Sequence, residues 1–257
     1  MQYNLKFIKQ EDFENHVKKT IEEYGEILKK IDLKKFNKNI IDPIKLLFDK
    51  NILNKTYKEI IELELTRQRD KSNNNAIGYF HQNIFKYINN CKVPKEGWDV
   101  VYEDINSKII YYIEMKNKHN TMNSSSAKST YIKMQNHLLN SKDKEKSVCA
   151  LVEIISKKSS DIEWAISIEK TKQLPNKRIR RISIDKFYEI VTGDKNSFRD
   201  LCIQLPITIE KIINNDSNFK IEQDTVFEEL ENIHKDILKA LYKLAFETYE
   251  GFTELQN

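Results

Sequence analysis

Apolar residues follow a helical period at the start of the chain and a β-strand pattern in its middle. Across residues 11–70 they recur at three- and four-residue spacings, as at Ile27 and Ile31, which predicts amphipathic helices. The polar stretch 67–75 predicts a loop. A second helical face follows, made of Ile77, Phe80, Ile84, Phe85 and Ile88. His81 lies on that same face.

Residues 98–115 have the pattern of a β-hairpin. Two runs rich in β-branched and aromatic residues, 98–104 and 109–115, flank the polar turn 105–108. Later in the chain we expect a helix at 127–139 and strands at 147–155, 162–168 and 179–184. The almost continuous apolar run 147–155 is typical of a strand buried on both faces. Helices return after residue 184, and the last is expected over residues 225–249.

Strands in the middle of the chain with helices before and after them predict an α/β fold, in which helices flank a central mixed β-sheet. With 257 residues, we expect a single domain. Its parts are a helical N-terminal region (1–74), an α/β core (75–185) and a helical C-terminal region (186–257). The C-terminal apolar stripe Ile233, Ile237, Leu241 and Leu244 predicts either core packing or a dimer interface.

Charge and cysteine content narrow the class of protein. The net charge is only +4, but Lys and Arg are concentrated in residues 108–146 and 177–181, which makes a polyanionic partner plausible. The three cysteines have neither disulfide-framework nor zinc-ligand spacing. No apolar run approaches the roughly 20 residues of a membrane span. We therefore expect a soluble cytoplasmic protein with no membrane association.

The hairpin brings together residues that suit metal-dependent chemistry. If its turn is centred between residues 106 and 107, Asp99 lies opposite Glu114. Lys116 shares a strand face with Glu114, because alternate side chains on a strand point the same way. Asp104 is the rival for the first carboxylate, at the turn end of its strand. The alternative to a catalytic site is a surface hairpin whose opposite charges pair.

Two carboxylates beside an ammonium group indicate phosphodiester hydrolysis assisted by Mg²⁺. Hard divalent cations prefer carboxylate oxygen and readily bridge to phosphate. Asp99 and Glu114 would bind the metal, and the backbone carbonyl of Met115 would supply another oxygen ligand. Lys116 would orient the attacking water and balance the charge that develops in the transition state.

Three segments, 75–82, 97–101 and 114–126, together resemble the type II restriction endonucleases that cut GGNCC or GGWCC sites, within the PD-(D/E)XK nuclease superfamily. Asp99 and Glu114-x-Lys116 match the superfamily motif, although Trp98 stands where the motif has its proline. The resemblance implies a Mg²⁺-dependent endonuclease that binds a near-palindromic site in double-stranded DNA as a homodimer. It also implies a methyltransferase that protects the host DNA.

Polar residues after the second hairpin strand are candidates for DNA contacts. They are Asn117, Lys118, His119, Asn120, Thr121, Ser124, Ser125 and Lys128. The alternatives are a solvated loop and, for the serines, helix capping. An HNH nuclease would need a second histidine and a ββα unit, which we do not find. Residues 177–181 predict a charged edge strand or a contact with the DNA backbone.

Other residues are candidates for supporting positions around the hairpin. His81 and Gln82 are possible accessory residues, although a core histidine is the ordinary explanation for His81. Gln82 or Glu64 would occupy the position of a helix-borne carboxylate near the metal. The helical phase of Lys133 is not fixed by the sequence. Competing functions are a repair or structure-specific nuclease and a non-catalytic DNA-binding protein on the same scaffold.

Overall fold

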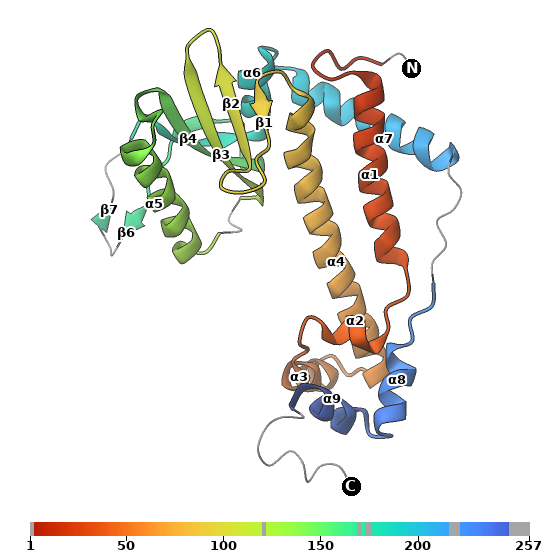
Figure 1. The fold of residues 1–257 in the computed structure, drawn as a ribbon. Helices are drawn as coiled ribbons and strands as arrows, with labels where there is room; N and C mark the ends of the chain where they lie inside the picture. The colour runs from red at the N-terminus through yellow and green to blue at the C-terminus, as the bar shows by residue number, and fades with distance from the viewer. Residues whose placement is uncertain (1–2, 120–121, 169–170, 173–175, 216–221, 247–257) are drawn as a thin grey trace. The chain divides into compact units, whose positions relative to one another are not determined.

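The computed structural model describes residues 3–119, 122–168, 171–172, 176–215 and 222–246 (Figure 1). The chain divides into two compact units, each assembled from two segments. We call residues 1–21 and 76–216 the sheet unit, and residues 22–75 and 217–257 the helical unit. Two long helices, α1 (Gln10–Leu28) and α4 (Tyr57–Asn83), contribute residues to both.

The sheet unit is built on a mixed six-stranded sheet with the order β1-β2-β3-β4-β8-β5. The strands β3–β4 and β4–β8 are parallel, and the other neighbouring pairs are antiparallel. The strand bounds are β1 Cys91–Lys92, β2 Val100–Asp104, β3 Ile109–Lys118, β4 Ser147–Ile155, β5 Asp161–Glu163 and β8 Ile179–Ser183. A separate two-stranded ribbon consists of β6 (Ser167–Ile168) and β7 (Thr171–Lys172).

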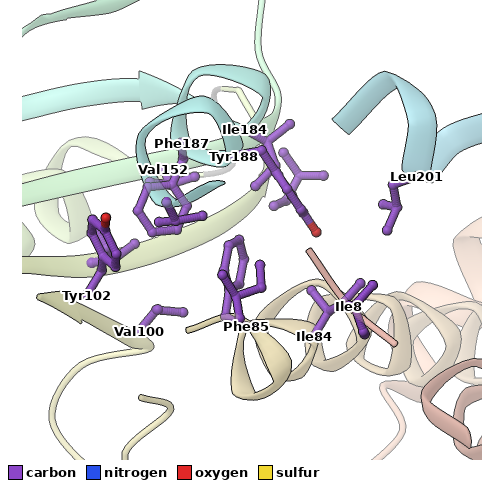
Figure 2. Packing of buried hydrophobic residues seen from close by; sticks show 14 of the residues in the cluster. Ile8, Ile84, Phe85, Val100, Tyr102, Val152, Ile184, Phe187, Tyr188 and Leu201 are labelled. Carbon is purple, nitrogen blue, oxygen red and sulfur yellow. The ribbon is translucent and has the colours of Figure 1, made fainter. Parts of the chain in front are cut away.

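Helices cover both faces of this sheet, which confirms the predicted α/β architecture. The helical segments of the unit, besides the parts of α1 and α4, are η1 Ile84–Tyr87, α5 Ser124–Asn140, η2 Lys144–Lys146, α6 Ile184–Thr192 and α7 Ser197–Asn215. On one face, Phe85, Phe187 and Tyr188 pack with Val100 and Val152 (Figure 2). On the other face, α5 packs its residues Tyr131, Met134 and Leu138 against Cys149, Leu151 and Ile179.

The apolar sequence of the central strand β4 follows from its burial on both faces of the sheet. Its residues face a hydrophobic cluster on each side of the sheet, so nearly all of them are apolar and buried. Glu153 is the one charged residue in the strand, and it is 3% exposed. A buried carboxylate needs partners, because an unpaired charge in the protein interior is strongly unfavourable.

The helical unit has a hydrophobic core of its own. Besides its parts of α1 and α4 it contains α2 Leu33–Asn37, α3 Pro43–Ile52, α8 Val226–Ile233 and α9 Ile237–Phe246. Apolar residues from five of these segments form its core, among them Phe36, Leu46, Ile61, Leu230 and Leu241. Asp32 and Asp42 cap α2 and α3. Arg69 forms a bidentate ion pair with Asp224, with both distances 2.7 Å.

The predicted loop at residues 67–75 is wrong, because α4 continues through it. This stretch lacks apolar positions, but several of its polar side chains form hydrogen bonds along the helix. Ser72 donates to the carbonyl of Gln68 at 3.2 Å, and Asn74 donates to the carbonyl of Asp70 at 2.9 Å. Side chains that usually favour turns therefore bond back to the preceding turn of a helix.

The predicted helix over residues 225–249 is instead two helices, α8 and α9, within the described part of that range. The side chain of Asp236 accepts from the backbone N–H of Leu238 at 2.9 Å, so it caps the start of the second helix. The strand expected at 162–168 is also divided, between β5 and β6.

The two units group the chain differently from the three regions expected from the sequence. Residues 1–21 belong to the sheet unit although they lie in the predicted N-terminal helical region, and α7 joins them there. The single-domain organisation stays a prediction. Within the described parts of the chain, no helix is both long enough and apolar enough to cross a membrane.

Candidate active site

The β2–β3 hairpin has the predicted register and places Asp99 beside Glu114. Val100 pairs with Ile113, and just before it the N–H of Asp99 donates to the carbonyl of Ile113 at 2.9 Å. The Oδ2 atom of Asp99 accepts from the N–H of Met115 at 2.7 Å. The carboxylate of Asp99 is thereby fixed against the backbone that immediately follows Glu114.

Glu114 and Lys116 lie on the face of the sheet that α5 covers. Ile113 and Met115, which alternate with them along β3, contribute to the hydrophobic cluster on the opposite face. Asp99 precedes Val100, which also belongs to that opposite cluster. Strand alternation therefore brings the three predicted catalytic residues to one face.

The rival carboxylate, Asp104, has a structural role at the turn. It pairs with Ile109 at the end of the hairpin. Its side chain accepts from the backbone N–H groups of Asn106 at 3.0 Å and Ser107 at 3.3 Å, and from the hydroxyl of Ser107 at 2.6 Å. Hydrogen bonding to Ser107 holds the pKa of Asp104 below its ordinary value. This carboxylate stabilises the turn.

A lysine from α5 also reaches the site. Lys133 forms an ion pair with Oε1 of Glu114 and donates to the carbonyl of Gly97. Its ammonium nitrogen lies 4.3 Å from the centre of the Trp98 ring, which is a cation–π contact. The structure thus fixes the helical phase of Lys133 that the sequence leaves open.

The accessory residues have different surroundings. Gln82 donates from Nε2 to the backbone carbonyl of Asp99 at 3.1 Å, so α4 supports the first carboxylate through its last turn. Burial, aided by the nearby His16, lowers the pKa of His81 to about 4, so this imidazole is neutral at pH 7. Glu64 belongs to the helical unit, where its carboxylate accepts from Arg67 and Gln68.

A second ionic group, missed by sequence reasoning, lies next to Lys116. Glu153 of β4 is the register partner of Lys116 and accepts a hydrogen bond from Arg181 of β8. His119 Nδ1 lies 3.0 Å from Glu153 Oε2 and 2.7 Å from a guanidinium nitrogen of Arg181. Burial alone would raise the pKa of Glu153, but the hydrogen bonds from Arg181 and His119 outweigh it and lower this pKa.

The basic run 177–181 does not lie on an edge strand. β8 lies between β4 and β5, which contradicts the edge-strand interpretation. Arg180 pairs with Asp161 at 2.6 Å, and Arg178 donates to the carbonyl of Lys144 at 2.5 Å. Arg181 donates to Glu153, which is the register partner of the predicted catalytic residue Lys116.

The structure separates the predicted DNA contacts into groups. Lys118, Ser124 and Ser125 are exposed, at the end of β3 and the start of α5. Asn123 caps α5 by accepting from the N–H of Ser126 at 2.8 Å, so no serine is needed for that purpose. Lys128 is partly exposed on the same helix, whereas Asn120 and Thr121 lie outside the described residues.

Asn117 has a position unlike that of its neighbours in the sequence. It alternates with Lys116 and Lys118 along β3, and a Cβ atom added to Gly78 would lie 3.5 Å from its side-chain nitrogen. Asn117 therefore packs beside the end of α4. Its role in DNA contact stays a prediction.

The donor set fits a hard cation. Asp99, just before β2, and Glu114 of β3 provide two neighbouring carboxylates, and the ammonium of Lys133 shows that a positive group can reach Glu114. No cluster of three or more Asp, Glu, His or Cys side chains that could hold a metal occurs among the described residues. A metal here would complete its coordination with backbone oxygen, water or phosphate, as Mg²⁺ commonly does.

Comparison with known proteins agrees with this chemistry. A model of the Eco47II restriction endonuclease family matches residues 5–214. The type II restriction enzyme Sau96I of Staphylococcus aureus is 33% identical over 213 residues, which cover 80% of each chain. The type II restriction enzyme Eco47II of Escherichia coli is 29% identical over 219 residues, 81% of this chain and 88% of that protein. These matches confirm the resemblance that the motifs indicate.

Proposed function

The chain belongs to the Eco47II restriction endonuclease family, and on this premise we propose that it is a type II restriction enzyme that hydrolyses double-stranded DNA with Mg²⁺. The observation that carries the proposal is the convergence of Asp99, Glu114 and Lys116 on one face of the β2–β3 hairpin. A non-catalytic DNA-binding protein would have no need of two carboxylates and an ammonium group in this arrangement.

Each residue of the site has a distinct task. Asp99 and Glu114, with the backbone carbonyl of Met115, would hold the metal. When bound, Mg²⁺ supplies the Lewis acidity that polarises the scissile phosphate and lowers the pKa of a bound water. Lys116 orients the attacking water and balances the negative charge of the transition state. Gln82 supports Asp99 through the backbone carbonyl it contacts.

The DNA is proposed to be a short near-palindromic site of the GGNCC or GGWCC type, cut by a homodimer. A symmetric dimer places one active site on each strand of a palindrome. The exposed side chains of Lys118, Ser124 and Ser125, together with Lys128, are suitably placed after the catalytic strand to contact DNA. A methyltransferase of the same specificity would protect the host site.

Digestion of unmethylated phage DNA with and without Mg²⁺ tests the function, followed by sequencing of the fragment ends. We expect discrete fragments that end at GGNCC-type sites and no cleavage in excess chelator. Metal-dependent smearing would indicate a nuclease without a short recognition sequence. Cleavage that persists in chelator would overturn the metal mechanism.

Matched variants of the hairpin test the site residues. Asp99→Asn and Glu114→Gln are each expected to abolish cleavage while DNA binding is largely retained. Removing one transition-state contact typically costs about 10²–10³-fold in rate. Asp104→Asn is the control, because Asp104 is an aspartate of the same hairpin that caps its turn. Full cleavage by Asp99→Asn would remove this residue from the site.

A further inference from the structure

We propose that Lys133 is a resident cation of the active site, which holds the carboxylate of Glu114 until a divalent metal replaces its ammonium group. This inference rests on the proposed function, because it takes Glu114 as a metal ligand. It goes further than that function because it assigns an exchangeable counter-ion to α5, a helix outside the catalytic motif.

The contacts of Lys133 are those of a bound cation. Its ammonium group touches a carboxylate oxygen of Glu114, a backbone carbonyl at Gly97 and the face of the Trp98 ring. Carboxylate and carbonyl oxygens are also the ligands that Mg²⁺ prefers. Lys133 and the metal therefore compete for the same kind of oxygen at the same residue.

The helix that carries Lys133 is packed against the sheet, whereas the lysine side chain is partly exposed to solvent. Tyr131 and Met134 are fully buried against the sheet, so the backbone around residue 133 is held in place. The Lys133 side chain is 39% exposed, but that of Glu114 is only 15% exposed. A flexible four-carbon stem can move the ammonium group into solvent while α5 stays where it is.

Electrostatic repulsion opposes binding of the Lys133 ammonium group and a divalent metal ion at Glu114 at the same time. Two positive charges within about 4 Å of one another repel strongly at the dielectric of a protein surface. A divalent ion that binds Glu114 must therefore displace the ammonium group. Without the metal, Lys133 adds to Lys116 in offsetting the charge of the two neighbouring carboxylates. The cost of displacing the lysine lowers the affinity for the metal.

A titration with Mn²⁺ in the absence of DNA tests this competition, with free Mn²⁺ measured by electron paramagnetic resonance. Lys133→Met keeps the length of the stem but removes the charge. We expect it to bind Mn²⁺ about two- to fivefold more tightly than the wild type, as the loss of one partly exposed competing ion pair implies. Lys133→Gln also removes the charge and provides a second test. Lys142→Met is the matched control, because Lys142 is an exposed lysine just after α5.

Tryptophan fluorescence supplies an independent readout. Trp98 and Trp164 are the two tryptophans of the chain. Movement of Lys133 off the Trp98 ring should change the emission of the wild type on addition of Mn²⁺, and Trp98→Phe should remove this change. Tighter binding by both Lys133 variants, with Lys142→Met unchanged, supports the inference.

The outcomes separate the inference from the function on which it rests. Equal or weaker Mn²⁺ binding by both folded Lys133 variants would overturn the exchange while leaving the metal site intact. Failure of every variant and of the wild type to bind Mn²⁺ would remove the metal site itself. Binding that survives in Glu114→Gln with unchanged affinity would show that the metal lies elsewhere, and it would overturn both.

Discussion

Substitution of Glu153 by glutamine should destabilise the sheet unit measurably. The side chain is nearly isosteric, so the change removes a charge without leaving a cavity. Glu153 is 3% exposed and is bonded to Arg181 and His119, whose side chains are 27% and 20% exposed. Breaking a fully buried ion pair costs about 3–5 kcal/mol. Because water reaches both partners and glutamine still accepts one bond, we expect a loss of about 2 kcal/mol.

Urea unfolding followed by tryptophan fluorescence measures this loss of stability in the sheet unit. Both tryptophans, Trp98 and Trp164, belong to the sheet unit. With an m-value of about 2 kcal/mol/M, a loss of about 2 kcal/mol lowers the midpoint by about 1 M. Glu163→Gln on β5 is the matched control, since Glu163 is an exposed glutamate of the same sheet.

The effect should depend on pH in one direction. The pKa of Glu153 is lowered in the folded protein, because the hydrogen bonds from Arg181 and His119 outweigh the effect of burial. Its stabilisation is therefore present above the unfolded pKa of about 4.3 and is lost as pH falls through the lower folded pKa. The difference between wild type and Glu153→Gln should narrow below about pH 4. Equal midpoints at pH 7, or a difference that stays constant down to pH 3, would refute the reasoning.

Two further substitutions test supporting contacts. Gln82→Ala removes one hydrogen bond to the backbone of Asp99 and should lower kcat about two- to tenfold with DNA affinity unchanged, as single-turnover cleavage would measure. A loss as deep as that of Asp99→Asn would show that Gln82 is itself catalytic. Asp224→Ala removes the partner of Arg69 and should destabilise the helical unit by about 1.5–3 kcal/mol. Hydrogen exchange of α2 and α8 measures this loss, and an equal effect of Glu228→Ala, at an exposed glutamate of α8, would contradict it.

The sequence was sufficient where the structure depends on local pattern. The turn at residues 105–108 determines the register of the hairpin, and with it the approach of Asp99 to Glu114. Strand alternation then places Lys116 on the same face. The run 147–155 has the apolar character that a strand covered on both faces requires.

Contacts between distant segments were not predictable in the same way. One partner of Glu153, Arg181, comes from β8, and that pairing depends on a strand order that no local pattern specifies. A signal was nevertheless present, because a charge within an apolar strand must be paired. Lys133 could not be placed from the sequence because the phase of α5 depends on its packing against the sheet. The loop prediction at residues 67–75 failed because Ser72 and Asn74 bond back along α4.

The short turn of the β2–β3 hairpin also bears on the order in which the site assembles. Strands joined by four residues meet with little loss of chain entropy, whereas β3 and β4 are parallel and are joined through the whole of α5. The contact between Asp99 and the strand of Glu114 is therefore local and forms rapidly during folding. Lys133 and Glu153 join only when the crossover closes. Lys116 is therefore the cation that the hairpin itself brings to the two carboxylates, and Lys133 adds a second one only after the crossover has closed.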